Sequence, residues 1–152
     1  MKNNTDLITL GWREWVRLPD LDIDAIKAKV DTGARTSAIH AFELETFTEK
    51  GKERVKFRMH PLLKDDATIV TCTADVLDKR VVTDSGGHKE ERIVISTMLG
   101  IGKYSWPIEA TLTARDTMMF RMLLGRTAIK GRAQVNPARS YLVGKKKRTT
   151  KD

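Results

Sequence analysis

The residues best suited to chemistry are an aspartate and the small residues that follow it, Asp31-Thr32-Gly33-Ala34. They come directly after residues 26–30, in which apolar residues alternate with lysines, the period of a half-buried strand. Alternation resumes at Thr36–Ile39, so an acid stands at a bend between two predicted strands. A carboxylate held at such a bend can act as a base, or share a proton with a second carboxylate.

The other chemistry-bearing residues are scattered. The three histidines, His40, His60 and His88, lack the spacing of a zinc site, and no second cysteine accompanies Cys72. The stretch Gly100–Lys103 is too compact for a phosphate-binding loop and lacks a hydroxyl residue after its lysine. We therefore expect no metal and no cofactor, ATP included. His40 and Cys72 lie in strand-like apolar surroundings, which favours packing roles for both.

Length and charge limit the class of protein. The chain has 152 residues and a net charge of +8, enough for one domain with a hydrophobic core, which we place at 1–143. No apolar run approaches the ~20 residues that cross a membrane, so we expect a soluble, cytoplasmic protein. Residues 144–152 are basic and lack an apolar residue, which predicts a disordered tail. Aromatic residues are only 6% of the chain, so we expect no nucleic-acid stacking surface.

Most of the chain has the pattern of short strands separated by turns. Leu7–Pro19 and Tyr104–Asp116 alternate like strands with one buried face. Phe47–Pro61 has a Lys-Gly tip and Ala74–Thr97 has an Asp-Ser-Gly-Gly tip, so each predicts a hairpin. Phe120–Gly131 begins as an apolar strand, turns at a glycine and continues as a short helix. The pattern predicts a mainly β protein, a small closed β-barrel with one short C-terminal helix.

Four blocks carry a resemblance to a known family: Gly11–Glu14, Lys29–His40, Glu91–Arg92 and Met122–Arg126. An Asp-Thr-Gly-Ala strand end paired with a later Leu-Leu-Gly before a helix resembles the retroviral-type aspartic proteases, the retropepsins. Over residues 7–143 the chain is similar to a bacterial retropepsin-like family labelled as ATP-dependent zinc proteases. Some members of that family are associated with the ligase that adds glutamates to ribosomal protein S6. The residues support neither the zinc nor the ATP of that label.

The resemblance implies that Asp31 is the catalytic acid of an aspartic-type peptidase. Peptide hydrolysis by carboxylates needs two of them sharing a proton, and this chain has one Asp-Thr-Gly. The mechanism therefore requires a symmetric homodimer in which the Asp31 side chains of two copies meet.

Six further residues are expected to support the Asp31 loop. Gly33 lets the backbone turn with its N–H toward the carboxylate, Thr32 anchors the loop through a side-chain hydrogen bond, and Ala34 leaves the cleft floor uncrowded. Leu124, Gly125 and Arg126 pack beside the loop, and Arg126 is expected to tie their turn to it.

A peptide in such a dimer would lie extended under a hairpin from each chain. Our candidate cover is Arg80–Ile95, whose Gly86-Gly87 tip allows movement, although an ordinary exposed hairpin has the same pattern. Candidate basic residues for the cleft are Arg35, Arg80, Lys89 and Arg92, each of which is also typical of a solvated surface charge. An acidic, glutamate-rich peptide would suit the positive charge of the chain.

Two other functions fit the same residues. The chain could be a retropepsin-like module that binds peptides without cleaving them, or an accessory protein that contacts a ribosome or RNA through the basic residues of 145–151. Met118 and Met119 lie at strand spacing and are expected in the core.

Overall fold

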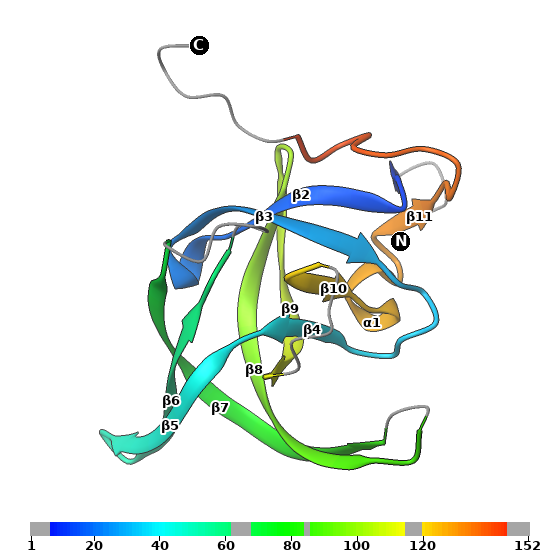
Figure 1. The fold of residues 1–152 in the computed structure, drawn as a ribbon. Coiled ribbons are helices and arrows are strands. Elements are labelled where there is room, and N and C mark those ends of the chain that lie inside the picture. Colours follow the sequence, from blue (N-terminus) through cyan, green and yellow to red (C-terminus); the bar gives the residue numbers. More distant parts are fainter. Residues whose placement is uncertain (1–6, 62–67, 84–85, 115–119, 146–152) are drawn as a thin grey trace.

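The computed structural model describes residues 7–61, 68–83, 86–114 and 120–145. Within these ranges the protein is mainly β with one short α-helix, as the sequence predicts (Figure 1). The strands, in chain order, are β1 (Ile8–Leu10), β2 (Arg13–Leu18), β3 (Ile23–Val30), β4 (Ser37–His40), β5 (Phe42–Glu49), β6 (Lys52–Met59), β7 (Val70–Thr83), β8 (Lys89–Ile101), β9 (Tyr104–Thr113), β10 (Met122–Leu124) and β11 (Ala133–Val135). A 3₁₀ turn covers Pro19–Leu21, and the helix α1 covers Arg126–Ile129.

Nine of the described strands form one sheet in the order β2-β3-β10-β4-β9-β8-β7-β6-β5. β2 also pairs with β8 through Arg17 and Gly100, so the first and last of the six neighbouring strands β2-β3-β10-β4-β9-β8 meet. The strands β7, β6 and β5 continue the sheet beyond β8. These pairings establish the mainly β class. The closed barrel remains a prediction.

The expected elements are found, with shifted bounds. The predicted strand Leu7–Pro19 is divided at Gly11 into β1 and β2, and β2 ends before the 3₁₀ turn that begins at Pro19. The first hairpin turns at Lys50 and Gly51, which both have positive φ, as a tight hairpin turn needs. The second hairpin is longer than predicted, because β7 and β8 extend past both ends of Ala74–Thr97.

Several expectations fall wholly or partly outside the described residues. Met118, Met119 and the end of the predicted strand Tyr104–Asp116 lie in 115–119. The first half of the second hairpin tip lies in 84–85, and most of the predicted basic tail lies in 146–152. Among the described residues, no helix is long and apolar enough to span a membrane.

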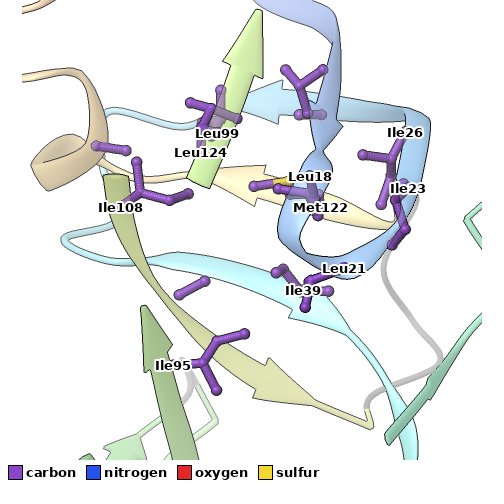
Figure 2. Close-up of a cluster of buried hydrophobic side chains, with 14 of the residues drawn as sticks. Leu18, Leu21, Ile23, Ile26, Ile39, Ile95, Leu99, Ile108, Met122 and Leu124 are labelled. Atoms are coloured by element: carbon purple, nitrogen blue, oxygen red, sulfur yellow. The ribbon is translucent and has the colours of Figure 1, made fainter. Parts of the chain in front are cut away.

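The hydrophobic core is formed by the buried apolar side chains that the strands direct to the same side of the sheet. Side chains from β2, β3, β4 and β10 meet there, among them Leu18, Ile26, Ile39, Met122 and Leu124 (Figure 2). All five are fully buried, and burying each side chain contributes roughly 1.5–3 kcal/mol relative to leaving it exposed. The strand that precedes Asp31 is therefore anchored among fully buried side chains.

β10 lies between β3 and β4 and brings together two distant parts of the sequence. It runs parallel to β3, with Leu124 opposite Val30, and antiparallel to β4, with Leu123 opposite Ala38. Because Val30 and Leu124 end their strands side by side, the Asp31 loop and the Gly125 turn emerge at the same edge of the sheet.

Candidate active site

Asp31 is held by its backbone at the end of β3. The N–H of Asp31 donates to the carbonyl of Leu124 at 2.8 Å, and the N–H of Val30 donates to the carbonyl of Trp12 at 2.8 Å. The Asp31 side chain is partly exposed, so its carboxylate is accessible from outside the chain. The core strands thus fix the position of an acid that remains open to solvent.

The loop after Asp31 folds back on its carboxylate. The N–H of Gly33 donates to Asp31 Oδ1 at 3.1 Å, as the sequence predicts, and the N–H of Ala34 donates to the Asp31 carbonyl at 3.2 Å. A Cβ at position 33 would lie 3.3 Å from Oδ1, tighter than ordinary contact. Thr32 is exposed and joins the loop through its carbonyl oxygen; within the described residues we find no hydrogen bond from its hydroxyl.

The first residues of α1 clamp the same loop from the other side. The N–H of Arg126 donates to the carbonyl of Ala34 at 2.7 Å, and the N–H of Thr127 donates to the carbonyl of Arg35 at 2.9 Å. Arg126 Nη1 also donates to the carbonyl of Thr32 at 3.0 Å, which is the tie that the sequence predicts for this arginine. Three hydrogen bonds therefore connect α1 to the backbone of residues 32–35.

Gly125 is required by close approach of two backbone segments. A Cβ at this position would overlap the carbonyl group of Thr36. The N–H of Gly125 donates to the hydroxyl of Ser37 at 3.0 Å, and Ser37 is fully buried. Our sequence reasoning missed this role of Ser37; a small hydroxyl residue at the start of an apolar strand, close after the acid, is the signal that could have indicated it.

A groove of about 440 Å³ lies beside this loop, between β4, β9 and β10 on one side and the β7–β8 hairpin on the other. Figure 1 shows the loop after β3 and the far end of this hairpin on the same side of the molecule. The lining combines apolar and small residues with three arginines and no acidic residue: Ala34, Arg35, Thr36, Ala38, Arg80, Val81, Val82, Thr83, Arg92, Thr111 and Leu123. All three predicted cleft arginines thus line this groove, whereas Gly86, Gly87 and Lys89 do not.

The three arginines differ in how far their charge is already compensated. Arg80 pairs with Asp78 at 3.0 Å and with Glu109 at 3.3 Å, and its hydrogen bond is the main cause that holds the pKa of Asp78 below the ordinary value. Arg92 has a side chain only 12% exposed; its Nε lies 3.4 Å from Glu90 but makes no hydrogen bond to any described residue. Arg35 is exposed and has no acidic partner among the described residues. Arg35 and Arg92 are therefore the arginines best able to bind a further carboxylate.

The remaining chemistry-bearing residues lie away from Asp31. His60 stacks on Phe42 with ring centroids 4.7 Å apart, and His40 is buried on β4. The thiol of Cys72 is buried and donates to the carbonyl of Leu21 at 3.5 Å; burial and then the charge of Asp22 raise its pKa to about 11. Among the described residues, no group of three or more His, Cys, Asp or Glu side chains could hold a metal ion. In this part of the chain, the residues therefore do not fit the zinc of the family label.

An Asp-Thr-Gly-Ala loop at the end of one core strand, clamped by a Leu-Leu-Gly strand end and a short helix, places the chain in the retropepsin-like class. The comparison with known families agrees. Residues 9–146 match the RimB-like family, described as retropepsin-like aspartic endopeptidase RimB, and the chain belongs to this family.

Its curated relatives are longer proteins. A probable alpha-L-glutamate ligase from Desulfotalea psychrophila is 48% identical over 135 residues, which cover 89% of this chain and 29% of the relative. Proteins of the same name from Shewanella pealeana and Parasynechococcus marenigrum are 42% and 44% identical, over 90% and 92% of this chain and 30% of each relative. The chain therefore spans about 30% of the length of these curated relatives.

A crystal structure supports the fold independently. A Legionella pneumophila protein of unknown function superposes with a TM-score of 0.75 at 23% sequence identity, and the match covers 89% of this chain and 97% of that chain. At this level of identity the likeness shows the fold alone.

Proposed function

We propose that the protein is an aspartic endopeptidase that works as a homodimer, with Asp31 of each copy forming the catalytic pair. The observation that carries the proposal is the Asp31 loop itself: a partly exposed carboxylate at a bend, with the Gly33 N–H 3.1 Å from its Oδ1 and the backbone clamped by β10 and α1. Membership of a family described as aspartic endopeptidases supports it.

Two such carboxylates supply the proton transfers that peptide hydrolysis needs. When they lie close together they share one proton, because two adjacent negative charges repel each other. The ionised Asp31 takes a proton from a water as the water oxygen attacks the peptide carbonyl, and the protonated Asp31 gives its proton to the carbonyl oxygen. As the C–N bond breaks, the Asp31 that took the proton from water gives it to the amide nitrogen. The other Asp31 takes a proton from a hydroxyl of the tetrahedral intermediate, which collapses to the new carboxyl group, and the pair returns to its starting state.

The loop can be approached by a second copy. Thr32 and Gly33, which follow the acid, are both exposed, and the hydrogen bonds that hold the loop come from the side of β10 and α1. A two-fold axis beside these residues would bring the two carboxylates together and would place the two grooves end to end, so that one extended peptide crosses both.

We propose that the substrate is an acidic, glutamate-rich peptide. The groove beside the loop carries Arg35 and Arg92 and no acidic lining residue, and the whole chain has a net charge of +8. The relatives are named alpha-L-glutamate ligases, so a peptide to which such a ligase has added glutamates, as in ribosomal protein modification, is the substrate we expect.

The test is mass-spectrometric detection of cleavage in a peptide library that includes glutamate-rich sequences. Wild type is compared with Asp31→Asn from pH 4 to 8, with and without a chelator. Asp24→Asn is the matched control, because Asp24 is an exposed aspartate on the same strand. We expect cleavage that survives the chelator, persists in Asp24→Asn and is lost in Asp31→Asn.

Cleavage lost on chelation would contradict the aspartic mechanism. Cleavage by none of the three proteins at any pH would favour a peptide-binding module without turnover. A preference for neutral peptides over glutamate-rich ones would contradict the proposed substrate class.

A further inference from the structure

Glu14 is a buried acid in β2 that the site described above does not use. It shares the inward face of the strand with Val16 and Leu18 and is 0% exposed. No Lys, Arg or His of the described residues forms an ion pair with it. A buried carboxylate without such compensation is costly, so its presence needs another explanation.

Backbone N–H groups provide the compensation. Glu14 Oε2 accepts from Gly11 at 2.6 Å and from Leu142 at 2.9 Å, and Oε1 accepts from Val143 at 3.0 Å and from Gly144 at 2.6 Å. Within the described residues, both oxygens thus have two donors each, in the charge-assisted type of hydrogen bond that is about twice as strong as a neutral one. Three of these four donors come from a segment some 130 residues away along the chain.

That segment, residues 139–144, lies along β2 and is here called the C-terminal strap. The N–H of Trp12 donates to the Arg139 carbonyl at 2.8 Å, the N–H of Tyr141 donates to the Arg13 carbonyl at 2.9 Å, and the N–H of Trp15 donates to the Gly144 carbonyl at 3.1 Å. A Cβ at Gly144 would overlap the Trp15 carbonyl, so only glycine allows this approach. The strap therefore behaves as a partner strand that Glu14 fastens at its end.

A continuous line of backbone hydrogen bonds runs from the strap to the acid of the loop. The backbone of Trp12 makes both hydrogen bonds: its N–H donates to the Arg139 carbonyl, and its carbonyl accepts from the N–H of Val30 at 2.8 Å. Val30 is the last residue of β3 and immediately precedes Asp31. A shift of the strap would thus reach Asp31 through two hydrogen bonds, the backbone of Trp12 and the Val30–Asp31 peptide bond.

We propose that Glu14 is a positioning residue for Asp31: by fastening the C-terminal strap to β2, it fixes the Trp12–Val30 contact and with it the catalytic loop. The catalytic part of this inference rests on the proposed function, whereas the structural linkage does not. The carboxylate is required, because each of its oxygens accepts from two backbone N–H groups. In a glutamine, an amide NH₂ would replace one oxygen and would face two N–H groups that are donors as well.

The test compares Glu14→Gln with Glu53→Gln, a glutamate at an exposed ion pair with Lys79 on the far β6–β7 part of the sheet. Amide hydrogen exchange is measured residue by residue by NMR, together with kcat and KM on a glutamate-rich peptide. In Glu14→Gln we expect exchange at Leu142–Gly144 and at Val30 to quicken by about tenfold or more, and kcat to fall by about tenfold with KM within about twofold of wild type. Glu53→Gln should match wild type in amide exchange, in kcat and in KM.

Faster exchange confined to the strap, with Val30 and kcat unchanged, would overturn the proposal. If Glu14→Gln does not fold, native-state exchange of the wild type with increasing denaturant decides: the Trp12, Val30 and Leu142–Gly144 amides must open together, and separate opening would overturn the linkage. If wild type cleaves no peptide, the proposed function fails, and the exchange of Val30 alone still decides whether Glu14 acts on the Asp31 strand.

Discussion

At the scale of single residues, the setting of Asp31 depends on small neighbours more than on other charges. Gly33 supplies an N–H where a side chain would crowd the carboxylate, and Ser37 offers a short hydroxyl that reaches the N–H of Gly125. Gly125 allows the turn after β10 to touch the backbone at Thr36. A side chain at Gly125 would overlap the Thr36 carbonyl group, and one at Gly33 would crowd the Asp31 carboxylate, so the loop is specified by size as well as by chemistry.

Gly125→Ala should therefore destabilise the protein strongly. The added Cβ overlaps the Thr36 carbonyl, and overpacking against backbone offers little room for relaxation, so we expect a loss of more than about 2 kcal/mol. Gly131→Ala is the control: it has a positive φ of 77° but open space around it, which costs about 1 kcal/mol. Urea unfolding of both variants measures the difference, and equal costs would contradict the close approach.

Cys72 should be chemically inert in the folded protein. Burial raises its pKa from 9.0 to about 11, which lowers the thiolate fraction near pH 8 by about 100-fold. Alkylation by iodoacetamide at pH 8 should therefore be at least about 100-fold slower in buffer than in urea. Rapid alkylation of the native protein would contradict this placement.

The raised pKa of Cys72 also makes the stability of the folded protein depend on pH. Folding favours the neutral thiol, so the contribution is fully present below pH 9, the ordinary value, and is lost as the pH rises from 9 to about 11. Wild type should lose more stability than Cys72→Ala over that interval in urea unfolding.

At the scale of elements, alternation and turn residues predict most of the sheet. Lys50-Gly51 indicates the first hairpin, and the small residues after Asp31 indicate the bend between β3 and β4. The pairing of β1 with β11 could not be predicted, because strands of three residues show almost no period and their partners are 125 residues apart. Glu14 could not be assigned for a related reason: three of its four donors lie in the strap, and a glutamate in a strand pattern favours the exposed face.

The groove between the β7–β8 hairpin and the Asp31 loop should determine preference for acidic peptides. Removing a charge that faces the groove, in Arg35→Gln or Arg92→Gln, is expected to lower kcat/KM for a glutamate-rich peptide by about tenfold while changing that for its glutamine counterpart by less than twofold. Arg58→Gln, an exposed arginine paired with Glu43 on β5 and β6, is the control. Equal losses of kcat/KM on both peptides would show that the arginines support the fold rather than recognise the negative charge of the peptide.

At the scale of the whole molecule, one chain holds one Asp31 loop, whereas the proposed catalytic pair needs two. The core strands, the strap and α1 hold one Asp31 in place using contacts of the same chain. In the proposed mechanism the second carboxylate comes from another copy, so activity should depend on association, whereas folding of the Asp31 loop should not.

Subunit mixing tests whether two copies of the chain supply the two carboxylates. Wild type is refolded together with a ninefold excess of Asp31→Asn, and cleavage of a glutamate-rich peptide is measured per wild-type chain. If each active site needs two Asp31 side chains, random pairing leaves about a tenth of the wild-type chains in active dimers, and activity falls to about a tenth. The same excess of Asp24→Asn should contribute its own full activity. Wild-type activity that is unchanged by the Asp31→Asn chains would contradict the shared catalytic pair.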